Sequence, residues 1–216
     1  MKTRTRDFSK KLGLVFIALF AALTLVACGF SESDATDYVK SSLDAFTKGD
    51  LKEYAKITNQ TEKAAQTEYD EGINSILTTF DTTGGLSDSR KEEFRSIIID
   101  VVKLSKYDVM SAEKTDKGFS VKVKIKPFTG LETLEDEMMK KLTPEAIAES
   151  GVNVEDNAAM LDWVTGIIVD LIKESIANPE YGNAKEMTVE VIKKDKQYNL
   201  SNSDMEKLIA AMLVNK

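Results

Sequence analysis

Few residue types in this chain of 216 residues could do chemistry. Cys28 is its single cysteine, and the sequence contains no histidine. These facts exclude a Ser-His-Asp triad and a zinc site built from histidine and cysteine ligands. If Cys28 is itself modified, they also exclude a thiolate nucleophile. Any catalysis would need carboxylates, lysine, tyrosine or a metal held by oxygen ligands. We predict no catalytic residue, no cofactor and no metal site.

Cys28 follows a stretch with the features of an export signal. Residues 2–11 carry five basic side chains and one acidic one, and residues 12–27 are 16 residues without a charge. A basic segment followed by a short apolar segment is typical of a signal peptide, whereas a membrane-spanning helix needs about 20 apolar residues. We therefore expect residues 1–27 to direct export. An uncleaved anchor helix, or a signal with an incidental cysteine, is the less favoured alternative.

The residues Leu25, Val26, Ala27 and Cys28 resemble the lipobox of bacterial lipoproteins. This resemblance implies a diacylglyceryl group on the Cys28 sulfur, with palmitate as a typical acyl chain, and cleavage before Cys28. It also implies an exported protein that lipid holds at the outer face of the cytoplasmic membrane. Residues 28–33 would then be the lipidated cysteine and a short tether, since five residues reach at most about 17 Å.

The remaining chain is strongly acidic. Without residues 1–27 it keeps 24 basic and 35 acidic residues, which gives a net charge of −11. Nucleic acid and anionic lipid attract basic surfaces, so this overall charge argues against binding either of them. We expect the membrane to be a partner through the lipid anchor and nucleic acid not to be one. An unknown protein or small molecule remains the other expected partner.

Two further groups are candidates for contact with a ligand or partner. Residues 119–126 alternate between apolar and polar types, which places Lys122, Lys124 and Lys126 on one face of a strand. The three ammonium groups could hold an anion, although pairing with acids of a neighbouring strand is the favoured interpretation. Tyr181 lies in a polar loop and could contact a ligand, although packing back onto the domain is favoured. Trp163 is expected in the core.

Elements that position these residues follow from periodicity and capping signals. Helices are predicted at 34–48, from 50, and at 61–80, 88–105, 131–142, 143–151, 156–177 and from 203, and strands at 107–113, 119–126, 186–193 and 197–200. Ser33 is the expected N-cap of the first helix, and Asp50 with Glu53 should form a capping box. The helix at 156–177 is the most apolar and should be buried on several sides.

These elements predict one α+β domain over residues 34–216. It should be rich in helix, with a small antiparallel sheet of three to four strands. The segment from Tyr38 to Asp50, which ends in Lys48-Gly49-Asp50, is similar to the first helix of small exported NTF2-like domains. That resemblance implies an NTF2-like topology in which the helices at 131–177 are an insertion.

The loop from Asn178 to Gly182 and the strand Thr188 to Val191 resemble uncharacterised lipoproteins of Gram-positive bacteria. In that family a domain of unknown function covers nearly the whole chain after the lipobox, and no catalytic residues carry over. The leading hypothesis is a non-enzymatic lipoprotein whose domain binds a ligand or partner near the membrane. A carboxylate-dependent hydrolase and a structural or assembly lipoprotein are the alternatives.

Overall fold

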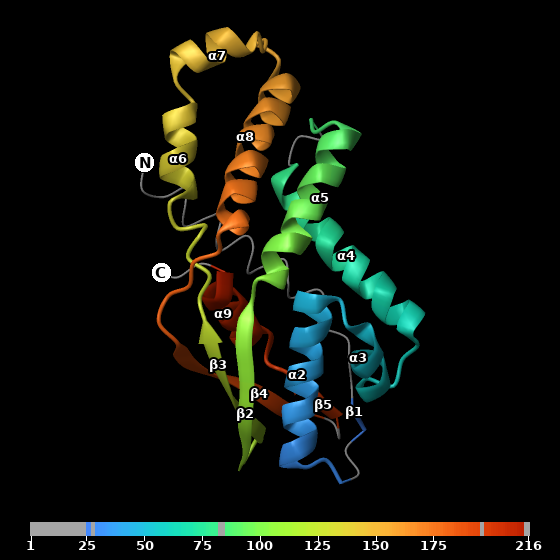
Figure 1. Cartoon of the computed structure of the whole chain (residues 1–216). Helices are drawn as coiled ribbons and strands as arrows, with labels where there is room; N and C mark the ends of the chain where they lie inside the picture. Colours follow the sequence, from blue (N-terminus) through green and yellow to red (C-terminus); the bar gives the residue numbers. More distant parts are fainter. Residues whose placement is uncertain (1–24, 27–28, 82–84, 195–196, 214–216) are drawn as a thin grey trace.

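The computed structural model describes residues 25–26, 29–81, 85–194 and 197–213. Within these ranges the chain forms eight helices and one antiparallel sheet, which confirms the helix-rich α+β fold (Figure 1). The helices are α2 (Glu32–Lys48), α3 (Leu51–Ile57), α4 (Glu62–Phe80), α5 (Asp88–Lys103), α6 (Leu134–Lys141), α7 (Pro144–Ser150), α8 (Asn157–Ala177) and α9 (Asn202–Leu213). The strands are β1 (Leu25–Val26), β2 (Lys106–Thr115), β3 (Gly118–Lys126), β4 (Lys185–Lys194) and β5 (Gln197–Leu200).

The sheet has the strand order β1-β5-β4-β3-β2. Four strands carry most of it, as predicted, and the two-residue strand β1 adds an edge. In β1, Leu25 pairs with Tyr198 and Val26 with Gln197 of β5. Strands β2 and β3 form a hairpin whose register shifts between Val109 and Ala112.

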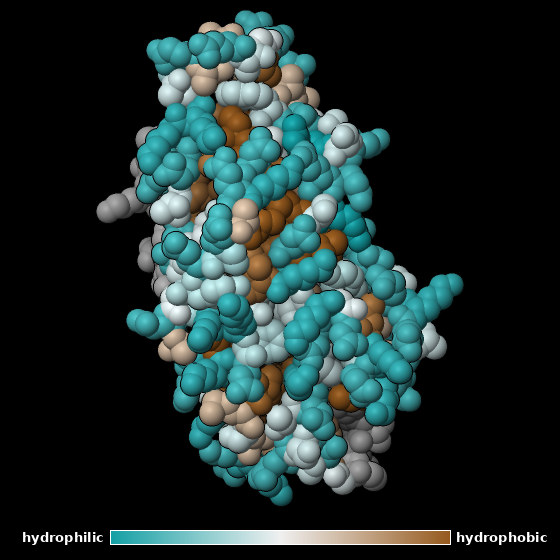
Figure 2. All heavy atoms as spheres, in the orientation of Figure 1, coloured by the Kyte–Doolittle hydropathy of each residue, from teal (hydrophilic) through white to brown (hydrophobic). Residues whose placement is uncertain are grey.

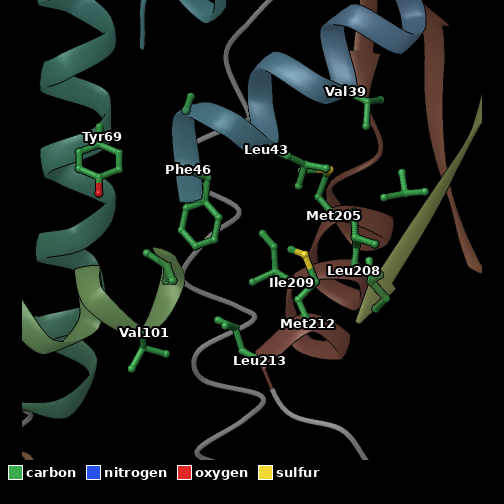
Figure 3. Packing of buried hydrophobic residues seen from close by; sticks show 14 of the residues in the cluster. Val39, Leu43, Phe46, Tyr69, Val101, Met205, Leu208, Ile209, Met212 and Leu213 are labelled. Carbon is green, nitrogen blue, oxygen red and sulfur yellow. The ribbon is translucent and has the colours of Figure 1, made fainter. Parts of the chain in front are cut away.

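One face of the sheet carries the core and the other is open. In β3 the residues Phe119, Val121, Val123 and Ile125 are buried, whereas the alternate lysines are exposed. Helices α2 and α9 both pack on this strand and cover the apolar face. Figure 3 shows side chains of α2 and α9, such as Leu43 and Leu208, converging in this core. The alternation read from the sequence therefore reports which face the helices cover.

Helices α6, α7 and α8 form an arm that extends beyond the end of the sheet (Figure 1). Helix α8 packs against α5 and α6. The prediction that α8 is buried on several sides is wrong: its buried residues are Thr165, Gly166, Val169, Leu171 and Ile172, and Trp163 is only half-buried. Two neighbouring helices cannot cover the whole circumference of a third, so part of the apolar surface of α8 stays accessible.

The helix ends show which local signals were read correctly. Thr143 caps α7 with Pro144 in its first turn, and Gly49 and Gly151 adopt the left-handed conformation directly after α2 and α7, close to the predicted ends of these helices. Ser33 is not the N-cap of α2. The N-cap is Ser31, two residues before Ser33, which forms a capping box with Asp34. Asp50 precedes α3 but makes no side-chain capping bond, so the capping box predicted there is wrong.

None of the helices in the part of the chain that the structure describes combines the length and the apolar character needed to cross a bilayer.

Candidate functional site

A groove between α2 and α3 is lined mainly by charged side chains and reaches Phe30. The left-handed residue Gly49 ends α2 and turns the chain into α3, which buries Tyr54 and Ala55. The groove has a volume of about 530 Å³. Its lining contains five carboxylates and two ammonium groups beside one hydroxyl and two apolar side chains: Asp34, Asp37, Asp44, Asp50, Glu53, Lys40, Lys56, Ser41, Phe30 and Ile57.

Asp44 lies at the base of this groove, where its side chain is only 9% exposed. Lys40 and Lys48, one helical turn before and after it, both donate hydrogen bonds to its carboxylate, Lys48 at 2.5 Å. Burial of Asp44 opposes its ionisation, but the hydrogen bonds from these lysines and from Tyr107 outweigh burial, and the pKa of Asp44 is lowered. Asp44 is therefore a charged structural centre that two flexible cations neutralise.

Tyr107 connects this centre to the sheet. Its hydroxyl donates to Asp44 Oδ1 at 2.6 Å and lies 2.9 Å from Thr47 Oγ1. Burial of the phenol and the hydrogen bond to Asp44 both raise the pKa of Tyr107 well above its ordinary value. The Lys48 ammonium lies 5.1 Å from the centre of the same ring. The hydroxyl therefore stays protonated at neutral pH and fixes β2 against α2.

We expect Asp44→Asn to lower the free energy of unfolding by about 1–2 kcal/mol at pH 7, because hydrogen bonds to a charged group are lost. The folded pKa lies below the ordinary value of 3.8, so the stabilisation is fully present above that value and is lost as pH falls through the folded pKa. Urea unfolding from pH 7 to pH 2.5 should show the difference between wild type and variant shrinking below pH 4. Asp37→Asn, on an exposed position of α2, is the control and should change little.

A second groove, of about 630 Å³, runs between α5 and α8. Glu93 on its wall accepts from Arg90 and, at 2.6 Å, from Lys173 of α8. The hydrogen bond from Lys173 is the main cause of the lowered pKa of Glu93, and burial acts against it. Figure 2 shows brown, hydrophobic surface along this side of the molecule, where Ile97 and Ile176 line the groove. The ion pair between Lys173 of α8 and Glu93 of α5 joins the arm to α5 and therefore stabilises the position of the arm.

Asp162 makes the other link between α8 and the body. Its Oδ1 accepts from the backbone nitrogen of Ser87 at 3.0 Å and from the Ser87 hydroxyl at 2.7 Å. Burial opposes ionisation of Asp162, but the bonds from Ser87 and the nearby Arg90 outweigh it and lower its pKa. Ser87 is also the N-cap of α5. One carboxylate thus fixes the arm to the start of α5.

The predicted lysine face lies on the open side of the sheet. Lys122 forms an ion pair at 2.6 Å with Glu113 of β2, an acid of a neighbouring strand, which is the favoured interpretation of the lysine face. Lys124 stands opposite Asp108 on one side and Glu186 on the other. Lys126 stands opposite another cation, Lys106. The three lysines are exposed, and the acids beside Lys122 and Lys124 partly offset their charge.

Tyr181 is half-buried and packs back onto the domain. Its hydroxyl donates to the carbonyl oxygen of Leu104 at 3.0 Å, and its ring lies 6.1 Å from that of Phe128. The ammonium of Lys106 lies 3.5 Å from the ring centre. Tyr181 and Lys126 therefore share Lys106 as a neighbour. The lining of the groove between α2 and α3 includes neither Tyr181 nor any of the three lysines predicted to contact a ligand or partner.

Ala27 and Cys28 lie outside the described residues, while Leu25 and Val26 form β1. Within the described ranges no three acids, cysteines or histidines come together as a metal site. Sequence reasoning missed Asp44 and Tyr107. One signal for Asp44 was present, because lysines stand four residues before and after it on a helix, but its partner Tyr107 is 63 residues away.

The sequence matches no protein-family model and no curated protein. The fold is similar to the crystal structure of YcdA from Bacillus subtilis, a protein described as a predicted lipoprotein. The TM-score is 0.57 at 16% sequence identity, and the match covers 85% of this chain and 56% of YcdA. At this identity the likeness shows a common fold, and this chain spans little more than half the length of that protein.

Proposed function

We propose that this chain is an exported lipoprotein, held at the outer face of the cytoplasmic membrane by a diacylglyceryl group on Cys28, whose domain binds a partner. The signal-like residues 1–27 and the lipobox pattern support the anchor, and the fold shared with YcdA, itself described as a predicted lipoprotein, is in keeping with it. Loss of the lipidated form on replacing Cys28 is its direct test.

The observation that carries the proposal is the packing of the residues that directly follow Cys28. Phe30 stacks on Tyr198 with ring centres 4.2 Å apart and also meets Phe119 at 5.6 Å. Ser31 then caps α2 through the capping box with Asp34. Packing onto the sheet and capping of α2 therefore occur within three residues of the position predicted to carry the lipid. These contacts involve no residue before Cys28, so cleavage before Cys28 would leave them intact.

A binding role fits the groove between α2 and α3 better than a catalytic one. Hydrolysis by paired carboxylates needs one acid whose pKa is raised so that it can donate a proton. The described carboxylates with displaced pKa values, Asp44, Asp81, Glu93, Glu113 and Asp162, are all shifted downward. Asp37, Asp50 and Glu53 instead offer exposed negative charge along the groove, which suits a basic segment of a partner.

Neutralising these three carboxylates tests the binding role. We expect Asp37→Asn/Asp50→Asn/Glu53→Gln in the full lipidated chain to weaken binding of a lysine-rich octapeptide about tenfold, equivalent to 1.4 kcal/mol. Fluorescence anisotropy at 0.15 M salt is the measurement, because the Debye length of about 8 Å then suppresses contributions from remote charges.

The matched control removes the same charge from the arm. Asp136, Glu145 and Glu149 are exposed on α6 and α7, and Asp136→Asn/Glu145→Gln/Glu149→Gln should leave the affinity nearly unchanged. Equal weakening by both triple variants would mean that the peptide responds only to net charge, and the groove would lose its assigned role.

A further inference from the structure

Two hairpin ends meet beside the start of the folded chain. The backbone nitrogen of Lys193, at the end of β4, donates to the carbonyl oxygen of Lys117 in the β2–β3 turn at 2.7 Å. Gly118 pairs with Ile192 across the same two strands. Phe30 stacks on Tyr198 at the start of β5, so the residues that follow Cys28 join the same end of the sheet. In Figure 1 the start of α2 and the β2–β3 turn lie at one end of the molecule, and α7 lies at the other.

Four exposed lysines, Lys114, Lys117, Lys193 and Lys194, occupy these hairpin ends, and we call them the hairpin lysines. Within the described ranges none of them forms an ion pair. Lys114 pairs with Phe119, and Lys193 pairs with Tyr198 and lies 5.7 Å from its ring. Because paired residues of antiparallel strands project on the same face, these two lysines flank the site where Phe30 packs.

Acidic residues follow Phe30 along the chain. Glu32 and Asp34 belong to the first turn of α2, and Asp34 is engaged by Ser31. They continue into the carboxylates of the groove between α2 and α3. On the hairpin side, Asp116 in the β2–β3 turn is the one acid among residues 114–118 and 192–194. Basic residues therefore predominate at the hairpin ends, whereas acidic residues predominate in the first turn of α2.

We propose that the hairpin lysines bind the phosphates of anionic lipid headgroups and thereby fix how the anchored domain stands on the membrane. This inference rests on the lipid anchor proposed above. Phe30 is two residues from Cys28, a span of at most about 7 Å, so the anchor brings the hairpin ends within the headgroup layer. Attraction at the hairpin lysines and repulsion at the groove carboxylates turn the domain about its short tether.

The orientation has a consequence for the rest of the surface. The hairpin lysines face the bilayer, the groove between α2 and α3 opens to the side, and the arm of α6, α7 and α8 points away. The acidic charge of the arm does not oppose this arrangement. Charges on the arm lie beyond a Debye length of about 8 Å at 0.15 M salt, so the local basic patch decides the contact.

Amine footprinting of the full lipidated protein tests the proposal. The protein is reconstituted in vesicles of phosphatidylglycerol or of phosphatidylcholine, treated with an acylating reagent and analysed by mass spectrometry. We expect the hairpin lysines to react about fivefold more slowly on phosphatidylglycerol, the ratio that corresponds to 1 kcal/mol per lysine. Lys140 and Lys141 on α6 should react equally on both, and 0.5 M salt should remove the protection.

A double variant shows whether the lysines act together. In Lys117→Gln/Lys193→Gln, the remaining Lys114 and Lys194 should lose most of their protection on phosphatidylglycerol, because the domain is no longer held in one orientation. The control Lys140→Gln/Lys141→Gln removes the same charge from the arm, and in this variant the hairpin lysines should stay protected on phosphatidylglycerol. All four substituted side chains are exposed, so folding should be unaffected, and circular dichroism checks this.

The outcomes separate this proposal from the anchor on which it rests. The mass of the Cys28 peptide reports whether the diacylglyceryl group is present, so its absence overturns the anchor. Lipidated protein whose hairpin lysines react equally on the two kinds of vesicle overturns the orientation alone. Protection that persists in the Lys117→Gln/Lys193→Gln variant would also overturn it.

Discussion

Replacement of Cys28 by serine is expected to abolish palmitate labelling and to remove the processed, membrane-bound form of the protein. The diacylglyceryl group is joined through the cysteine sulfur, and serine offers no thiol for that bond. Two acyl chains hold a protein stably because each buried CH₂ contributes about 0.8 kcal/mol, whereas the net charge of −11 after residue 27 offers no comparable attraction. Cell fractionation with metabolic palmitate labelling measures both effects.

The control for this experiment is Ser33→Ala, an exposed substitution five residues further along that should leave labelling and fractionation unchanged. Two other results are informative. A Cys28→Ser protein that still carries palmitate would disprove the assigned lipid site. If wild-type protein stays in the membrane without any label and keeps residues 1–27, the leader is an uncleaved anchor, which was the alternative interpretation of the sequence.

Gly118→Ala is expected to destabilise the fold by at least about 3 kcal/mol, because a side chain at this position has no room. A Cβ atom on Gly118 would lie 2.0 Å from the carbonyl oxygen of Val191, and the residue has φ of +143°. The obstacle is backbone of the neighbouring strand, which cannot move without opening the β3–β4 ladder. Chemical denaturation of the purified domain should show the loss as a lower midpoint.

Gly151→Ala separates the two contributions to that effect. Gly151 has φ of +68° after α7, and a Cβ atom there would meet nothing within 4 Å. Its substitution should therefore cost only the left-handed conformation, about 1–2 kcal/mol. Equal destabilisation by the two variants would show that backbone conformation alone sets the cost and that β4 adapts to a side chain at position 118.

The sequence predicted what depends on neighbours along the chain. Alternation in residues 119–126 identified the buried face of β3, and the helix predicted at 143–151 corresponds to α7, because both patterns depend on residues close together in the sequence. The cap of α2 was misplaced because Ser31 and Ser33 are equally good caps by type, and the returning bond from Asp34 selects Ser31. The predicted NTF2-like topology stays a prediction.

Features that depend on distant contacts could not be read in the same way. The apolar character of α8 is real, but periodicity does not state how many neighbours a helix has, so its accessible surface and the half-buried Trp163 were missed. The groove between α2 and α3 was also missed. Asp44 at its base is held by a hydrogen bond from Tyr107, and these two residues are separated in the sequence by α3, α4 and α5.

The pairing of β1 with β5 acquires a meaning once cleavage before Cys28 is considered. Leu25 and Val26 cover the free edge of β5 at Tyr198 and Gln197, yet both belong to the segment that maturation would discard. The precursor and the mature protein would then differ in their sheets. Processing at the proposed site would remove the strand that covers β5 and would leave backbone donors and acceptors of β5 unpaired beside the proposed anchor. Signal removal would thus uncover a template for strand addition only after the protein has reached the membrane.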